Sequence, residues 1–183
     1  MTIRSALTAL LVALASVVSA ASSAAPSGQD RARYYVPEVP ADVGAVDFYL
    51  LTVGVGDEVA NRFGHTGLRI VDPVQKSDVV FNWGKFYFDQ SGFLWKFFRG
   101  SLVYSMGVRT FNGDVMRQMQ DERHLVMEKL NLTDLQKRRL YDKIAWNALP
   151  ENRDFRYQYW YKNCSTIPRD YLDEVLGGQV RAR

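Results

Sequence analysis

The sequence has few of the residues that build disulfides and metal sites: its 183 residues include one cysteine, Cys164, and two histidines. A single cysteine excludes an internal disulfide, and so small a set provides no ligand cluster at the usual zinc-site spacings. The Gly54-Val55-Gly56 segment is followed by Asp57, so it lacks the third glycine and the lysine of a phosphate-binding loop. We therefore expect no metal and no cofactor.

The chain also has only a small net positive charge. The formal net charge is +3, and it falls by one unit if an N-terminal segment containing Arg4 is removed. The densest basic cluster, residues 137–139, lies in a predicted helix, where a solvated face explains it. Nucleic acid is therefore not an expected partner.

Long uncharged runs are missing outside the N-terminus. After Arg4, no charge occurs from Ser5 to Ala25, and small residues suit cleavage after Ala20 or a few residues later. We interpret residues 1–25 as a signal peptide; an uncleaved membrane anchor is the alternative, which alanine and serine disfavour because they dilute a segment barely long enough to span. The protein is therefore expected in the periplasm or secreted. Residues 26–44 are polar and contain prolines, which indicates a linker or N-terminal arm. Residues 45–183 are predicted to form one domain.

Hydrophobic patterns within that domain predict both strands and helices. Alternating and β-branched residues predict strands at 46–53, 65–71, 78–83, 102–108 and 124–130. Helical spacing predicts helices at 92–99, 112–122, 135–149 and 167–176. The third of these helices follows a capping box formed by Thr133 and Gln136. The expected fold class is α+β, a small antiparallel sheet with packed helices.

Cys164 lies where the last predicted helix begins. Ser165 and Thr166 are expected to cap this helix, and Pro168 is tolerated in its first turn. Free backbone N–H groups and the helix dipole favour a thiolate there and can stabilise an oxyanion. The pattern indicates a nucleophilic thiol, although a buried, inert cysteine is the alternative.

A thiolate nucleophile needs an imidazole partner, and His65, at the start of a predicted strand, is the better candidate. His124 follows three charged residues and is expected at the surface. Asn82, in the next strand, is nominated as the group that orients His65, ahead of Asp72 and Asp78. Asn163 has a simpler interpretation as the cap of the turn before the helix.

Four segments together resemble the Lnb N-terminal periplasmic domain family. They are Gly64-His65-Thr66-Gly67-Leu68-Arg69-Ile70, Phe81-Asn82-Trp83-Gly84-Lys85-Phe86-Tyr87-Phe88, Phe97-Phe98-Arg99-Gly100-Ser101-Leu102-Val103-Tyr104, and Asn163-Cys164-Ser165-Thr166 followed by Arg169-Asp170. The resemblance covers about Val46 to Arg183. It implies a circularly permuted papain-like fold, as in the lecithin:retinol acyltransferase group, with the histidine strand before the cysteine helix.

Membrane-bound relatives in that family are associated with lipoprotein N-acylation through a cysteine thioester. The resemblance therefore implies Cys164 as nucleophile, His65 as base, and lipid or lipoprotein acyl donors and acceptors in the envelope. It leaves membrane association open, and the role of Asn82 is our structural inference. Pro168 departs from the expected pattern. The sequence stops at Arg183, before the transmembrane helices of the acyltransferases, which fits either part of a longer protein or a member with another acceptor.

The leading hypothesis is a periplasmic cysteine-dependent acyltransferase. A cell-wall amidase or peptidase of papain-like type is a second hypothesis, and a non-catalytic envelope binding module is a third. Aromatic residues 93–98 suit either core packing or an acyl-chain groove.

Overall fold

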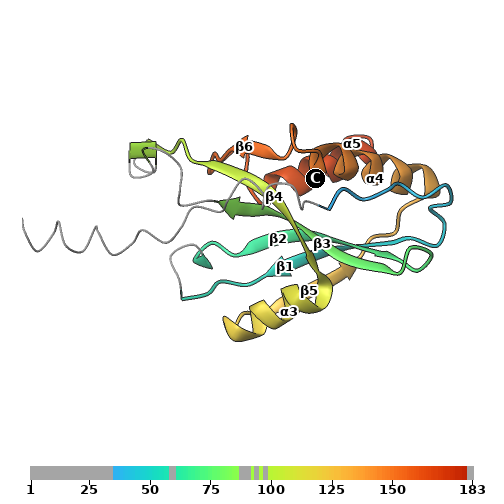
Figure 1. The fold of residues 1–183 in the computed structure, drawn as a ribbon, viewed down its shortest axis with the longest axis horizontal. Helices are drawn as coiled ribbons and strands as arrows, with labels where there is room; N and C mark the ends of the chain where they lie inside the picture. Colours follow the sequence, from blue (N-terminus) through green and yellow to red (C-terminus); the bar gives the residue numbers. More distant parts are fainter. Residues whose placement is uncertain (1–34, 58–60, 87–91, 93–94, 97–98, 181–183) are drawn as a thin grey trace, which may run out of the picture. The chain divides into compact units, whose positions relative to one another are not determined.

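The computed structural model describes residues 35–57, 61–86, 92, 95–96 and 99–180. These residues form an α+β domain with a six-stranded antiparallel sheet and three helices (Figure 1). The elements are β1 (Asp47–Val53), β2 (His65–Asp72), β3 (Ser77–Phe86), β4 (Val103–Thr110), α3 (Phe111–Gln120), β5 (Leu125–Lys129), α4 (Asp134–Ala148), β6 (Asp154–Arg156) and α5 (Thr166–Val175). The predicted α+β class and antiparallel sheet are confirmed.

The strand order in the sheet is β5-β1-β2-β3-β4-β6. Strands β1 to β4 pair in sequence order, β5 returns to lie beside β1, and β6 adds to β4 at the opposite edge. Strand β3 runs three residues beyond the predicted end, and its pairing with β4 shifts register between Trp83 and Lys85. This irregularity lies opposite the start of β2.

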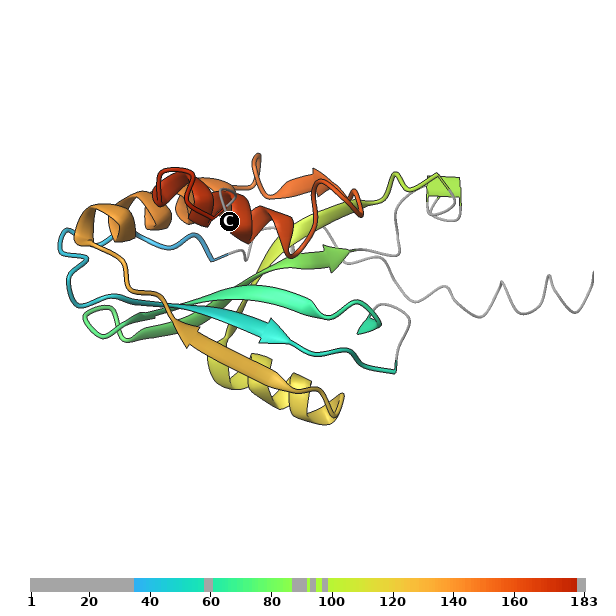
Figure 2. The ribbon, with the colours of Figure 1, turned by 180° about the vertical axis from the view of Figure 1, so that it is seen from behind.

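Helices cover both faces of the sheet. Consecutive strand residues point to opposite faces, and β3 illustrates this. The Trp83 indole donates to Asn147 of α4 at 2.7 Å, whereas the neighbouring Asn82 amide donates to Asp114 of α3 at 3.4 Å. Helices α4 and α5 therefore lie on one face and α3 on the other, as Figures 1 and 2 show.

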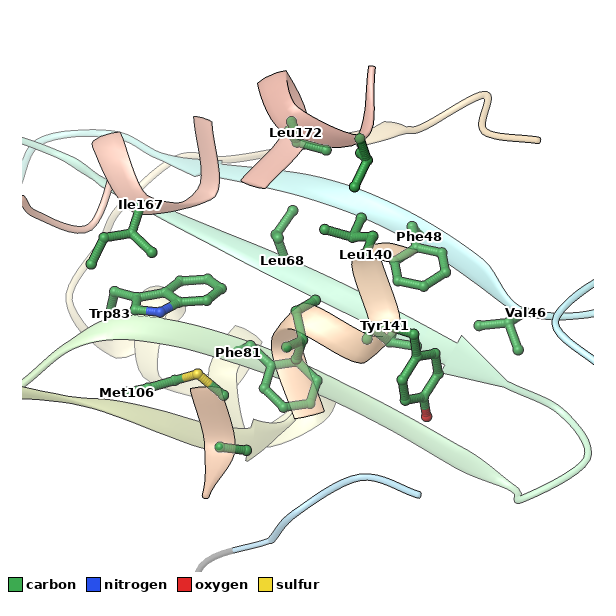
Figure 3. Close-up of a cluster of buried hydrophobic side chains, with 14 of the residues drawn as sticks. Val46, Phe48, Leu68, Phe81, Trp83, Met106, Leu140, Tyr141, Ile167 and Leu172 are labelled. Carbon is green, nitrogen blue, oxygen red and sulfur yellow. The ribbon is translucent and has the colours of Figure 1, made fainter. Parts of the chain in front are cut away.

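The main hydrophobic core lies between the sheet and helices α4 and α5. Trp83 is fully buried there, and its ring meets Tyr171 of α5 edge-on at 5.8 Å. Figure 3 shows Ile167 and Leu172 of α5 directed at the same layer of strand side chains. The buried cluster comprises Val46, Phe48, Leu68, Ile70, Phe81, Trp83, Met106, Leu140, Tyr141, Ile144, Ala148, Phe155, Ile167, Leu172 and Val175. This packing holds α5 against the sheet.

Helix α4 begins with the predicted capping box. The Thr133 hydroxyl accepts a hydrogen bond from the Gln136 N–H, and the Gln136 side chain accepts one from the Thr133 N–H. The helix ends at Ala148, one residue before the predicted end and two residues before Pro150. Local sequence is sufficient to set this element's boundaries.

Part of the predicted N-terminal arm is described and contacts the domain. The Tyr35 hydroxyl lies 3.3 Å from the Ser77 hydroxyl, and Lys137 of α4 donates to the Gly44 carbonyl at 2.8 Å. The signal peptide predicted over residues 1–25 lies outside the described residues. Residues 93–94 and 97–98 of the predicted aromatic helix also lie outside them, and Trp95 between them is 64 % exposed. Within the described ranges, none of the helices has the length and apolar character needed to span a bilayer.

Candidate active site

His65 is the first residue of β2, and Gly64 allows the strand to begin there. The φ angle of Gly64 is 70°, and an added Cβ would lie 3.0 Å from the Val53 carbonyl oxygen. Only glycine adopts this conformation without strain, so the turn needs it. Pairing between β2 and β3 stops at Gly67 and Asn82, which leaves His65 and Thr66 beyond the last β3 partner. His65 thus pairs with Val53 of β1 on one side, and on the other its ring meets the side chains of β3 instead of a backbone partner.

The His65 ring is oriented by Asn82. The His65 Nε2 atom lies 2.8 Å from Asn82 Oδ1. Because an amide oxygen only accepts hydrogen bonds, Nε2 carries the proton, and Nδ1 is the nitrogen left for Cys164. The ring occupies space that a side chain at position 84 would take, since a Cβ on Gly84 would lie 3.1 Å from His65 Cε1. Glycine at position 84 thus makes room for the imidazole.

Asn163, rather than Ser165, caps the turn that carries Cys164. The Asn163 side-chain oxygen accepts from the N–H groups of Ser165 at 2.9 Å and Thr166 at 3.0 Å. In return, the Thr166 hydroxyl accepts from the Asn163 N–H at 2.8 Å. Ser165 makes no side-chain cap, so the cap predicted at Ser165 is wrong. A Ser165 cap would need the N–H of Ile167 or of position 168, but the Ile167 N–H donates to the Asn163 carbonyl at 3.1 Å and Pro168 has no N–H. The Asn163 carboxamide takes the N–H groups of Ser165 and Thr166, which leaves neither for an oxyanion.

The sulfur of Cys164 lies among hydrogen-bond donors. The His65 side chain, the Thr66 backbone and the Ser165 side chain all contribute to the pKa of its thiol as hydrogen-bonding groups. Burial alone would raise the pKa of the thiol, but the hydrogen bond and positive charge of His65, followed by the other two donors, lower it overall. These contacts favour the thiolate.

The pKa of His65 shifts in the complementary direction. Burial would lower this pKa, but the hydrogen bond and negative charge of Cys164, together with smaller contributions from Asn82 and Asp114, raise it overall. A raised imidazole pKa and a lowered thiol pKa are the two halves of a thiolate–imidazolium pair. The pair is populated to the extent that the thiol pKa falls below the imidazole pKa, and both shifts act in that direction.

Asp114 is a member of the site that sequence reasoning missed. Its side chain is 3 % exposed on the α3 face, where its carboxylate accepts from the Asn82 Nδ2 atom at 3.4 Å. This contact fixes the Asn82 amide with its oxygen toward His65, and the negative charge raises the pKa of His65. In the sequence, Asp114 is indistinguishable from an ordinary acidic residue in the first turn of a helix.

Asp72 and Asp78, the weaker candidates for the group that orients His65, do not contact it. Asp72 accepts from the N–H groups of Val74 and Gln75 in the β2–β3 turn, and Asp78 forms an ion pair with Arg69 at 2.7 Å. His124 is exposed, as predicted. The structure thus brings Cys164, His65 and Asn82 together and excludes both aspartates from the group.

The sequence matches the model of one protein family. The model of the Lnb N-terminal periplasmic domain matches residues 39–183, most of the sequence. The chain belongs to the Lnb N-terminal periplasmic domain family. No curated protein and no solved structure matched it. The Lnb domain includes Cys164, His65, Asn82 and Asp114, and the family's periplasmic assignment agrees with the predicted export.

Replacing Asn163 with alanine in this Lnb domain should reduce the free energy of unfolding by about 1–2 kcal/mol, because it removes a buried cap. Denaturant unfolding measures this loss. The matched control is Ser165→Ala, which removes an exposed hydrogen bond to the Thr66 hydroxyl but no helix cap, and should cost less, at most about 1 kcal/mol. A larger loss in Ser165→Ala than in Asn163→Ala would contradict the assigned cap.

Replacing Asp114 with asparagine should lower the pKa of His65, because a buried negative charge is removed. The imidazolium would then be less populated, so alkylation of Cys164 below neutral pH should also be slower. A proton NMR titration of the His65 ring measures the pKa directly. Asp121→Asn, at the far end of α3, serves as the control and should leave the titration in place. An unshifted His65 titration in Asp114→Asn would remove Asp114 from the site.

Proposed function

We propose that this Lnb domain is a cysteine-dependent acyltransferase of the periplasm that works through a thioester on Cys164. The supporting observation is the hydrogen-bonded series of Cys164, His65 and Asn82 at the end of the sheet. Thiol, imidazole and side-chain amide in this order are the groups used by papain-like thiol enzymes. The histidine strand precedes the cysteine helix along the chain, so the arrangement corresponds to a permuted form of that fold.

In the first step, the Cys164 thiolate attacks the carbonyl carbon of an ester. A C–S bond forms, the C–O bond breaks, and the His65 imidazolium gives its proton to the departing alkoxide. The product is a thioester on Cys164 and a free alcohol. Asn82 keeps the imidazole facing the sulfur throughout, because it holds the opposite ring nitrogen.

In the second step, an amine attacks the thioester carbonyl. A C–N bond forms, the C–S bond breaks, and neutral His65 accepts the proton released by the amine. The thiolate and the imidazolium are thereby restored. In both steps, negative charge develops on the carbonyl oxygen beside the first turn before α5, where the Cys164 N–H has no acceptor among the described residues.

Intact-mass spectrometry after incubation with a p-nitrophenyl acyl ester tests the proposal. We expect one acyl group on the wild-type chain, stable in acid and absent from Cys164→Ser. Adding a primary amine should remove the adduct and yield the corresponding amide. Loss of the adduct to water at a rate that amine does not change would indicate a hydrolase instead. No adduct at all on the wild-type chain would overturn the proposal and favour a binding module.

A further inference from the structure

Four exposed aromatic side chains gather beside the candidate active site, and we call them the aromatic patch. Phe63 is 72 %, Tyr159 47 %, Trp160 75 % and Tyr161 77 % exposed. Exposing several large rings together is unfavourable in water, so a concentration of this kind indicates an interaction surface. Neither the core nor the proposed chemistry at Cys164 uses these rings.

Three of the patch rings are in contact, and the patch is linked to the residues that position the site. The Phe63 ring meets the Tyr159 ring edge-on at 5.2 Å, and Tyr159 meets Trp160 at 4.8 Å. The Tyr159 carbonyl accepts from the Asn163 side chain at 2.6 Å, the same side chain that caps the turn of Cys164. Phe63 also lies two residues before His65. A partner bound to the patch would therefore be held next to both reactive groups.

The charged residues nearest to the patch rings in the sequence are basic. Asp154 and Asp170 flank the segment that carries residues 159–161, and Asp170 forms an ion pair with Arg169 at 2.7 Å. Arg62 directly precedes Phe63 and Lys162 directly follows Tyr161, and both side chains are exposed. This charge complements an anionic partner, although the net charge of the whole chain is small.

We propose that the aromatic patch docks the domain on the surface of an anionic lipid bilayer. Tryptophan and tyrosine rings have an apolar body and a polar atom, which suits the boundary between headgroups and acyl chains. Basic side chains beside them attract anionic headgroups. A peptide partner would need a groove with backbone hydrogen-bonding groups, whereas the patch offers outward-facing rings. The inference goes beyond the thiol chemistry, because docking does not require Cys164 to react.

Vesicle co-sedimentation tests the proposal with two probes, phosphatidylcholine vesicles with and without phosphatidylglycerol. The wild-type chain should bind the anionic vesicles more tightly than the neutral ones, and added salt should weaken the binding. The double variant Trp160→Ala/Tyr161→Ala should bind the anionic vesicles more weakly, on the order of tenfold, because it loses most of the exposed ring area. Circular dichroism checks that the double variant folds.

Two controls locate the effect and separate it from the proposed catalysis. Trp146→Ala removes an exposed tryptophan, 59 % accessible on α4 and outside the patch, and should bind as the wild-type chain does. Cys164→Ser should also bind as the wild-type chain does, so a failure of the thiol chemistry and a failure of docking give different results. The proposal is overturned if the wild-type chain binds neither vesicle or if the double variant binds as tightly as the wild-type chain. It is also overturned if Trp146→Ala weakens binding as much as the double variant does.

Discussion

Replacing His65 with alanine is expected to slow alkylation of Cys164 by iodoacetamide at about pH 6.5 by on the order of tenfold or more. The His65 hydrogen bond and charge are the largest contributions that lower the pKa of the thiol. Burial, which raises this pKa, would remain in the variant. The thiolate fraction at this pH would therefore fall, and the reaction rate would fall with it. Iodoacetamide is uncharged, so its approach does not depend on the charge of position 65.

The second histidine provides a matched control for this experiment. His124 is exposed and lies in the segment before β5, so His124→Ala should react as the wild-type chain does. Because Cys164 is the chain's one cysteine, all thiol-specific labelling reports on that residue. Equal alkylation rates in His65→Ala and His124→Ala would show that the imidazole does not activate the sulfur.

Replacing Trp83 with alanine is expected to lower the free energy of unfolding by about 3–5 kcal/mol. The side chain is fully buried, contacts Tyr171 of α5 and donates to Asn147 of α4. The variant would leave a cavity and also remove the partner of a buried amide oxygen. Denaturant unfolding followed by circular dichroism measures the loss.

The control for Trp83 is the exposed Trp146 of α4. Trp146→Ala should change the free energy of unfolding by no more than about 0.5 kcal/mol, because its ring is mostly in water. A loss below about 1 kcal/mol in Trp83→Ala would contradict the packing that holds α5, and with it the position of Cys164, against the sheet.

The parts of the fold that local sequence determines could be predicted. Alternation of apolar residues located strands β1 to β4, and the Thr133 capping box located the start of α4. Local sequence patterns could not show which distant segments pair with each other. The return of β5 to the edge beside β1, and the addition of β6 to β4, depend on how the whole chain packs. The register shift after Trp83 is likewise a property of the assembled sheet.

The scarcity of cysteine and histidine explains why the site was largely predictable. Because the sequence has one cysteine and two histidines, Cys164 had only two possible histidine partners, and His65 was the better candidate. Asn82 was then nominated as the orienting group from its place in the next strand. Asp114 could not be found, because only the packing of α3 on the second face brings it to Asn82. The interpretation of Asn163 as the cap of the turn before the helix is confirmed, because its side-chain oxygen accepts from the N–H groups of Ser165 and Thr166.

The most direct test of the central claim is the pH titration of the Cys164 thiolate by its absorbance near 240 nm. The spectrum of Cys164→Ser is subtracted at each pH, which removes the contribution of the tyrosines. The account predicts an inflection below the ordinary pKa of a cysteine, moved upward by His65→Ala. An inflection at or above the ordinary value, unchanged in His65→Ala, would contradict the proposed thiolate–imidazolium pair.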